Sequence, residues 1–275
     1  MLLPRLITSV IGIPIAIFAI YWGGIPFLIM MFAVVYLALH EFFVLASHGG
    51  YSNQNIVGTI AGLMLFFALV LNTTSMGAVS VSHGTALTIS LILLLIFARE
   101  VFSKNHEKII ERLSVTFMGA FFVPWTLGHL VLLRSIKPAG MLYVFYLFII
   151  IWILDTGAYA VGRRFGQKQL ASYISPKKTI EGAFGGIITA VLTGMLSYFI
   201  FLKNYFSLPE LVLISFVISV ISQFSDLSES LLKRDVGVKD SANLLPGHGG
   251  MLDRFDSFLF TAPLFYYYLV IFKGN

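Results

Sequence analysis

Long apolar runs recur along this chain of 275 residues and restrict its fold more than any other feature. Hydrophobic residues make up 58% of the sequence and charged residues 11%, whereas an ordinary soluble domain is about 25% charged. A water-soluble domain of this length could not bury so much apolar surface, but a bilayer solvates runs of about 20 apolar residues directly. The runs do not alternate with polar residues, as the strands of a barrel would. The sequence therefore predicts an all-α, polytopic membrane protein.

Nine windows are apolar enough to predict transmembrane helices, although 56–72 is short and 79–98 is diluted by polar residues. The windows lie at 4–22, 25–46, 56–72, 79–98, 114–133, 141–161, 183–202, 208–228 and 255–272. No small-residue cleavage site follows the first of them, so we interpret it as a span and not as a secretory signal. We expect one membrane domain over 1–275, with residues 1–135 as a lipid-embedded scaffold and 141–275 as the catalytic part.

The distribution of lysine and arginine predicts the orientation. With a cytoplasmic N-terminus, 14 of the 18 basic residues fall in cytoplasmic connections and 4 on the other side, as the positive-inside rule requires. Two cytoplasmic connections, 162–182 and 229–254, are long, and long loops are often functional. A third connection, 99–112, resembles a short amphipathic helix at the membrane surface, and we interpret it as a solvated face with its Lys and Arg side chains near lipid phosphates. We therefore expect a protein of the cell's inner membrane, with its active site facing the cytoplasm.

Acidic residues gather at the predicted cytoplasmic helix ends. Asp155 ends the sixth window, Asp226 and Glu229 end the eighth, and Asp253 and Asp256 open the ninth. Carboxylates beside apolar helices are costly and by default indicate function, and their hard oxygen atoms suit Mg²⁺. Alternatively, Asp253 caps a helix and Asp256 offsets its macrodipole. That alternative does not extend to Asp226 and Glu229, because negative charge is unfavourable at a helix C-terminus.

Basic residues and a glycine turn accompany these acids. Lys233, Arg234, Lys239 and Arg254 are interspersed among the acids of the second long loop, and Pro246–Gly250 precedes the ninth window. A glycine turn before a helix lets backbone N–H groups approach a phosphate. Together with metal-binding carboxylates, these features indicate a nucleoside triphosphate site, although a salt-bridged solvated surface is the usual alternative for such a run.

The other long loop has a similar composition. Lys177 and Lys178 precede a glycine-rich helix start that includes Gly185 and Gly186. The lysines could simply obey the positive-inside rule, but we expect them to contact phosphate. For the two glycines we favour close helix packing. With no cysteine in the chain, thiolate zinc sites and cysteine nucleophiles are excluded.

These stretches resemble the signature of the phosphatidate cytidylyltransferases, also called CDP-diacylglycerol synthases. The resemblance covers about the C-terminal half, and the N-terminal helices match only as generic apolar segments. The residues of the second loop that carry it are Ser230, Leu232, Lys233, Arg234, Lys239, Asp240, Ala242, Leu245, Pro246, His248, Gly249, Gly250, Met251, Asp253, Arg254, Phe255 and Asp256. Those of the first are Asp155, Thr156, Gly157, Ala158, Tyr159, Gly162, Arg163, Ser175, Pro176, Lys177, Lys178, Thr179, Glu181 and Gly182.

The resemblance implies that CTP and phosphatidic acid react to give CDP-diacylglycerol and pyrophosphate. Mg²⁺, as more than one ion, is the implied cofactor, with Asp226, Asp253 and Asp256 as ligands and Glu229 as a further candidate. The expected catalytic residues are Asp226, Lys233, Asp253 and Asp256, and the expected substrate-binding residues are Lys177, Lys178, Arg234, Lys239, Asp240, His248, Gly249, Gly250 and Arg254. The expected partners are the two substrates and membrane lipid, without nucleic acid, and a homodimer is left open.

Three other functions stay open on the sequence. A CTP-dependent lipid kinase would share the C-terminal features but transfer the γ-phosphate. An ion-coupled transporter would place its charges near the bilayer midplane, and a purely structural subunit would need no site. His40 and Glu41, near the end of the second window, are interpreted as an interfacial pair or a helix contact and not as catalytic residues.

Overall fold

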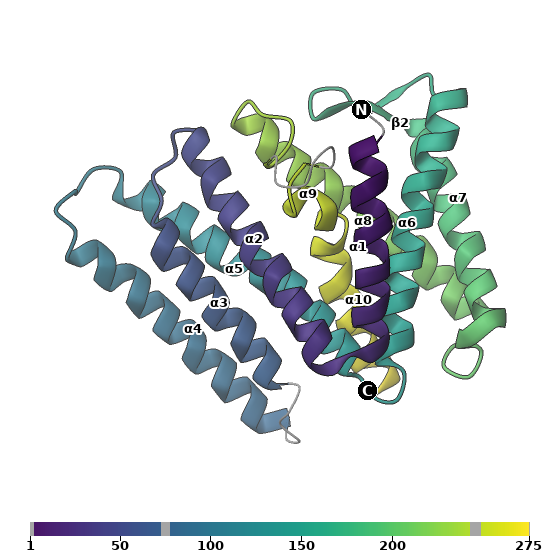
Figure 1. The fold of residues 1–275 in the computed structure, drawn as a ribbon, viewed down its shortest axis with the longest axis horizontal. Coiled ribbons are helices and arrows are strands. Elements are labelled where there is room, and N and C mark those ends of the chain that lie inside the picture. Colours follow the sequence, from purple (N-terminus) through teal and green to yellow (C-terminus); the bar gives the residue numbers. More distant parts are fainter. Residues whose placement is uncertain (1–2, 73–77, 243–248, 275) are drawn as a thin grey trace. The chain divides into compact units, whose positions relative to one another are not determined.

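The computed structural model describes residues 3–72, 78–242 and 249–274 and is almost entirely helical (Figure 1). Every one of the nine predicted windows coincides with a helix, which confirms the all-α fold. The chain divides into two compact units, one formed by residues 1–135 with 235–255 and the other by 136–234 with 256–275.

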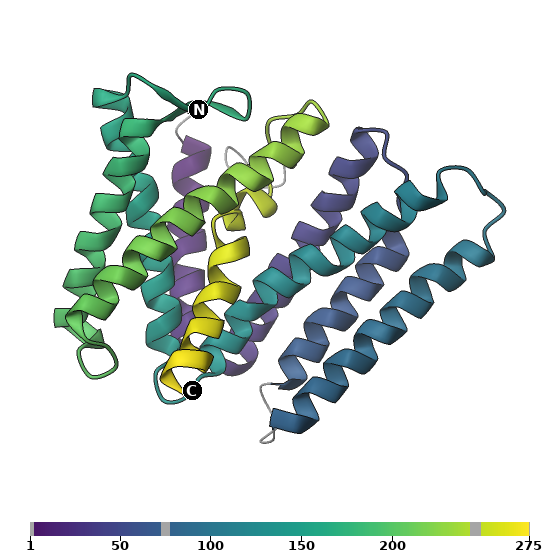
Figure 2. The same cartoon turned by 180° about the vertical axis from the view of Figure 1, so that it is seen from behind.

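The first unit contains five long helices and one short helix. These are α1 (Leu3–Trp22), α2 (Gly24–His48), α3 (Asn55–Asn72), α4 (Ala78–Val101), α5 (Ile109–Ser135) and α9 (Leu252–Phe255). Helix α3 lies between α4 and α5 (Figure 2), and its Ala61 and Leu65 are buried against Ile96 of α4 and Ala120 of α5. Burying such aliphatic side chains stabilises each contact by about 1.5–3 kcal/mol, so the three helices form a hydrophobic core of their own.

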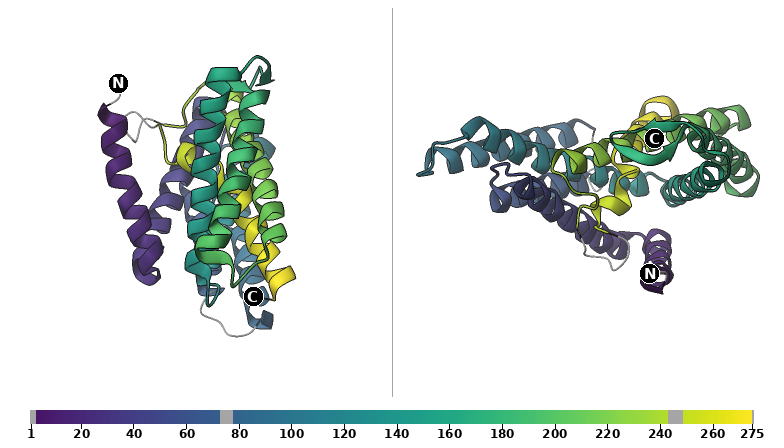
Figure 3. Two further views of the ribbon diagram at one scale, coloured as in Figure 1. Left: turned by 90° about the vertical axis from the view of Figure 1, so that its right-hand side faces the viewer. Right: turned by 90° about the horizontal axis from the view of Figure 1, so that it is seen from above.

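The second unit contains α6 (Gly140–Phe165), a hairpin of β1 (Gln169–Ala171) and β2 (Ser175–Thr179), and α7 (Ile180–Ser197), which a π-helical turn at Tyr198–Leu202 continues. The helices α8 (Leu208–Asp235) and α10 (Phe258–Lys273) complete it. The antiparallel hairpin lies at the end of the α6–α7 pair (Figure 3). The sequence predicted a long loop here, without strands.

Small residues allow α6 and α7 to pack closely. A Cβ atom on Gly185 would lie 2.5 Å from the Val161 side chain, and one on Gly186 would lie 3.0 Å from the carbonyl oxygen of Leu154. On α6, a Cβ atom at Gly157 would overlap the Thr189 side chain of α7. The interpretation of Gly185 and Gly186 as packing residues is therefore confirmed, since no larger side chain fits at this distance.

Within the described residues, six helices are long and apolar enough to cross a membrane. They lie at Gly24–His48, His83–Val101, Ile109–Ser135, Gly140–Phe165, Ile180–Leu202 and Leu208–Asp235. Three shorter apolar helices, Val10–Trp22, Asn55–Leu71 and Phe258–Lys273, correspond to the remaining predicted windows. The protein is therefore a polytopic membrane protein, while nine crossings and a cytoplasmic N-terminus stay predictions.

The segment 99–112 does not form the separate amphipathic helix that the sequence suggested. Residues up to Val101 belong to α4 and residues from Ile109 belong to α5, with an irregular connection between them. Arg112 explains the difference, because its guanidinium pairs with Glu100 and also donates to the carbonyl groups of Asn105 and Glu107. These bonds hold the connection in a turn.

The acidic residues also lie differently from the prediction. Asp155 and Asp226 lie within α6 and α8 and not at their ends, so the macrodipole argument does not apply to Asp226. Helix α8 continues to Asp235, and lysine partners offset the charges of Asp226 and Glu229 within it. Asp253 lies in α9, whereas Asp256 lies in the turn before α10. Asp253 and Asp256 therefore do not both belong to the start of one helix.

Replacing Gly185 with alanine should lower the melting temperature of the detergent-solubilised protein. The new methyl group would overlap the β-branched Val161 side chain, and overpacking of this kind costs about 1–3 kcal/mol. A matched control is Gly84→Ala in α4, where no atom lies within 4 Å of the added Cβ. Equal melting temperatures for both variants would contradict close packing of α6 on α7.

Candidate active site

A cavity of about 410 Å³ opens within the second unit. Its wall comes from α6, the hairpin, α7 and α8, and it includes Asp155, Arg163, Lys177, Lys178 and Asp226. Leu154 and Ala158 of α6, Leu170 of β1 and Ala183 of α7 form its apolar part. Its size is that of a small-molecule site, and its charged residues are of both signs.

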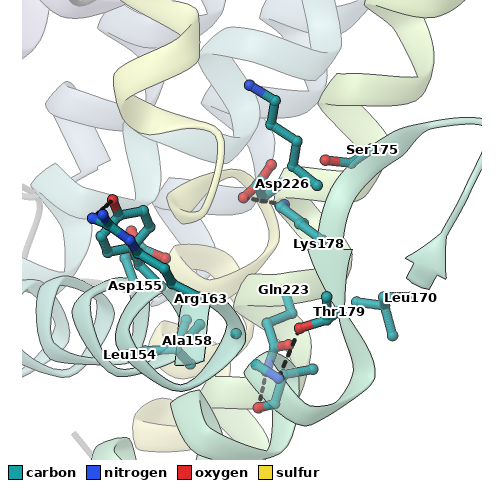
Figure 4. A pocket seen from close by; sticks show the side chains of 15 residues that line it. Leu154, Asp155, Ala158, Arg163, Leu170, Ser175, Lys178, Thr179, Gln223 and Asp226 are labelled. Carbon is teal, nitrogen blue, oxygen red and sulfur yellow. Dashed lines mark hydrogen bonds and ion pairs between the residues drawn. The ribbon is translucent and has the colours of Figure 1, made fainter. Parts of the chain in front are cut away.

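Lys178 and Asp226 meet in this cavity. The Lys178 side chain points from β2 toward Asp226 of α8, and the two form an ion pair (Figure 4). Both side chains are partly exposed, at 33% and 23%, so solvent and ligands can reach them. Asp155 and Arg163 of α6 line the same cavity (Figure 4). A lysine already held next to a carboxylate is well placed to bind a phosphate associated with a cation.

Asp256 lies in a cluster of carboxylates near the start of α10. Burial raises the pKa of Asp256 well above its usual value, and the charges of Asp226 and Glu229 raise it further. Asp155 adds to this effect and Lys233 opposes it. Part of the Asp256 surface remains accessible, but the surrounding protein atoms remove most of its hydration. Negative charges brought together in this way favour binding of a cation.

Lys233 offsets the negative charge of one carboxylate in the cluster, that of Glu229. It forms an ion pair with Glu229 one turn earlier in α8, and both side chains are buried. A buried pair of this kind must keep both partners, because removal of one leaves an uncompensated charge. Lys233 thus lies among the acids as predicted, but its observed contact is with a carboxylate.

Backbone contacts fix the hairpin beside the cavity. Thr179 caps α7 by accepting a hydrogen bond from the Gly182 N–H at 3.1 Å. The Glu181 carboxylate accepts hydrogen bonds from the N–H groups of Gln167 and Lys168. From α8, Arg234 donates to the carbonyl group of Ile174 at 2.9 Å. The strand that carries Lys177 and Lys178 is therefore held at both ends.

A second group of signature residues lies in the first unit. Asp253 Oδ2 accepts hydrogen bonds from the backbone N–H of Ser241 at 2.9 Å and of Gly250 at 2.8 Å. Glu41 of α2 accepts from the N–H groups of Met251 and Leu252 at 2.7 and 2.8 Å. The Ser241 hydroxyl lies within hydrogen-bond distance of both carboxylates. The two acids together hold the segment that leads into α9.

Glu41 is a functional candidate that the sequence analysis set aside. It is buried at 3% exposure and takes up two N–H groups before and within the first turn of α9. Such groups have no partner inside their own helix. The interpretation as a helix contact is right about its location, but the contact is with the signature segment, about 200 residues further along the chain. A buried glutamate in an apolar helix was the only available signal.

The remaining predicted residues are spread over the first unit. Lys239, Asp240 and Arg254 are exposed there. Gly249 has a positive φ of 79°, and a Cβ atom on it would lie 2.6 Å from Asp253 Oδ2. Only glycine therefore suits the turn next to Asp253. His248 lies outside the described residues.

The carboxylate oxygen atoms of the second unit are of the kind that Mg²⁺ prefers. Among the described residues, no group of three or more acidic, histidine or cysteine side chains forms a full metal-binding set. Mg²⁺ does not require one, since it commonly binds through one or two carboxylates together with phosphate oxygens and water. Asp226 and Asp256 supply two carboxylates whose mutual repulsion a cation would relieve.

The fold and the cavity define a membrane protein with a charged site of small-molecule size. Residues 3–272 match the model of the cytidylyltransferase family. The chain therefore belongs to that family and is an enzyme. The match extends through the N-terminal helices, so it is broader than the C-terminal resemblance seen in the sequence.

Curated relatives match nearly the whole chain. A protein named phosphatidate cytidylyltransferase from Bacillus subtilis is 35% identical over 271 residues, covering 98% of both chains. One of the same name from Staphylococcus epidermidis is 33% identical, covering 94% of this chain and 96% of its own. A third, from Synechocystis sp., is 32% identical and covers 97% and 96%.

Glu41→Ala should loosen the segment before α9. Loss of a charged acceptor for buried N–H groups costs about 1.5–3 kcal/mol, so the amides of Met251 and Leu252 should exchange with deuterium faster than in the wild type. His40→Ala is the control, because His40 is the exposed neighbour of Glu41 on the same helix. Unchanged exchange at both amides in Glu41→Ala would show that Glu41 does not hold the segment.

Proposed function

We propose that this enzyme transfers the cytidylyl group of CTP to phosphatidic acid, giving CDP-diacylglycerol and pyrophosphate. Membership of the cytidylyltransferase family supports the transferred group, and the names of the full-length relatives support the acceptor. The observation that carries the proposal is the cavity in which Lys178 pairs with Asp226, next to the carboxylate cluster at Asp256.

The basic residues of the cavity are proposed to bind phosphate. Lys177, Lys178 and Arg163 line the cavity and provide three cations. A substrate phosphate entering it can compete with Asp226 for the ammonium group of Lys178. Cations held in place before the substrate arrives stabilise the charge that builds up during phosphoryl transfer without further reorganisation.

Further contacts to CTP are proposed for residues of the second long loop. They are Lys239, Asp240, His248, Gly249, Gly250 and Arg254. Lys233 and Arg234 are proposed to hold this region through their contacts in α8 and to the hairpin.

The proposed chemistry needs orientation more than proton transfer. An oxygen of the lipid phosphate, which is already an anion, attacks the α-phosphorus of CTP. A new P–O bond forms, the bond from the α-phosphorus to the oxygen that bridges it to the β-phosphorus breaks, and pyrophosphate leaves with those electrons. No proton has to move, so the protein contributes alignment and charge compensation.

Magnesium is proposed as the cofactor, held by Asp226 and Asp256 with Asp253 as a further ligand. When bound, the ion would neutralise phosphate charge and polarise the phosphorus centre. Support comes from the repulsion between Asp226 and Asp256 and from the short sequence separation of Asp253 and Asp256. We propose that the site faces the cytoplasm, in agreement with the distribution of lysine and arginine.

The reaction is tested by following label from CTP into lipid with purified protein, phosphatidic acid and Mg²⁺. Label on the α-phosphorus should enter the lipid, whereas label on the γ-phosphorus should appear in pyrophosphate. Asp226→Asn and Asp253→Asn should reduce the rate by about a hundredfold or more, because each removes a charge proposed to bind metal. Transfer of γ-label to lipid would identify a lipid kinase and refute the proposal.

The asparagine substitutions also separate two roles of Asp253. Asparagine keeps an oxygen that can accept from the Ser241 and Gly250 N–H groups, so a purely organising role predicts a mild loss. The matched control is Asp235→Asn, an exposed carboxylate at the end of α8, which should retain nearly full activity. Full activity in Asp253→Asn would remove this residue from the proposed metal site.

Added Mg²⁺ should raise the melting temperature of the substrate-free protein at neutral pH. A ligand at ten times its dissociation constant stabilises by about 1.4 kcal/mol, which corresponds to about 3 °C in a protein of this size. Asp226→Asn should reduce the shift strongly and Asp235→Asn should retain it. An equal shift in all three proteins would place the stabilising ion elsewhere.

A further inference from the structure

A second cavity, of about 390 Å³, opens in the first unit. Its wall comes from residues 52–54 before α3, the start of α3, the end of α4, the connection 102–108 and the start of α5. It contains two arginines and one glutamate, with serine and asparagine side chains between them. Its lining includes Gln54, Asn55, Ile56, Arg99, Glu100 and Arg112. None of these residues was assigned a role in the proposed reaction.

The charges in this cavity leave a surplus cation. Arg112 is fully engaged, since it pairs with Glu100 and also donates to two backbone carbonyl groups. Arg99 is exposed and, among the described residues, forms no ion pair or hydrogen bond. Glu100 is thus offset by Arg112, and the guanidinium of Arg99 remains as the positive group. A guanidinium with this freedom suits bidentate binding of a phosphate.

A buried acceptor in the same cavity requires a donor. Gln54 is 8% exposed, and its Nε2 donates to Glu100 at 2.7 Å and to the Ile96 carbonyl group at 3.3 Å. Those two acceptors fix the orientation of the amide. Its Oε1 is buried and, within the described part of the chain, accepts no hydrogen bond. Such an orphaned acceptor costs about 1–3 kcal/mol, which a ligand hydroxyl group would recover once a small shift of the cavity wall exposes this atom.

The rim of the cavity is apolar and accessible. Ile56, Val101, Phe102 and Ile110 surround the same helix ends and are between 72% and 85% exposed. Helix α4 is apolar enough to cross a membrane and ends at Val101, so the cavity lies where lipid headgroups meet the hydrocarbon core. Large exposed apolar side chains at such a position are accounted for by contact with lipid.

We propose that this cavity binds the headgroup of an anionic phospholipid that carries a free hydroxyl group, as phosphatidylglycerol does. The lipid phosphodiester contacts Arg99, the headgroup hydroxyl donates to Gln54 Oε1, and the acyl chains pass over the apolar rim. The site is separate from the proposed active site and takes a lipid that is neither the proposed substrate nor the product. A free phosphate shares the charge but cannot use the rim.

Native mass spectrometry of the detergent-purified protein with added phosphatidylglycerol tests the site. Arg99→Ala should weaken lipid binding about tenfold, the effect of losing one charge-assisted hydrogen-bonding group. The control is Lys104→Ala, an exposed cation of the same connection that does not line the cavity, and it should bind like the wild type. The active-site variant Asp226→Asn should also bind like the wild type, since this site does not depend on the proposed reaction.

Changing the lipid tests the hydroxyl contact without altering the protein. Phosphatidylmethanol has the same phosphodiester charge but no hydroxyl group, so it should bind several-fold more weakly than phosphatidylglycerol. Equal binding of the two lipids would overturn the Gln54 contact. Equal binding by wild type and Arg99→Ala, or an equal loss in Lys104→Ala, would overturn the site as a whole. Displacement of the lipid by equimolar inorganic phosphate would show that a soluble anion, and not a lipid, is the ligand.

Discussion

Charge neutralisation among apolar helices is the constraint on which this structure depends. A charge removed from water is stable only with a partner of opposite sign or with hydrogen-bond donors. The first unit meets this condition by pairing Glu100 with Arg112 and by directing backbone N–H groups at Glu41. In the second unit, Lys178 and Lys233 pair with Asp226 and Glu229, but Asp155 and Asp256 add further negative charge. The excess of acids there is the physical basis of the proposed cation.

Close packing of α6 on α7 serves the same site. Glycines at their interface bring the two helices together, and the hairpin between them then lies directly at their ends. Thr179 and Glu181 fix the hairpin to the start of α7, and the backbone position of Lys178 is thereby fixed as well. The cavity thus depends on backbone contacts made by residues that carry no charge as well as on those that do. Such preorganisation is what charge stabilisation in catalysis requires.

The sequence predicted the helices well because a run of about 20 apolar residues is a local signal. Its errors concern features that depend on partners distant in sequence. Helix α8 passes the predicted end at 228 because Lys233 pairs with Glu229 and the distant Lys178 pairs with Asp226. The connection after α4 turns because Arg112 reaches back to Glu100. A hairpin of only eight strand residues lacks the length for a clear alternating pattern.

The same reasoning explains why the C-terminal signature alone was an incomplete description of the family. The segment 235–255, which carries much of that signature, belongs to the same compact unit as residues 1–135. Glu41 accepts hydrogen bonds from Met251 and Leu252, so a residue of the second helix shapes the turn that leads to Asp253. Hydrogen bonds between distant segments leave no periodic trace in a sequence. They make the second helix a part of the structure that holds the signature segment, in agreement with a family match that begins at residue 3.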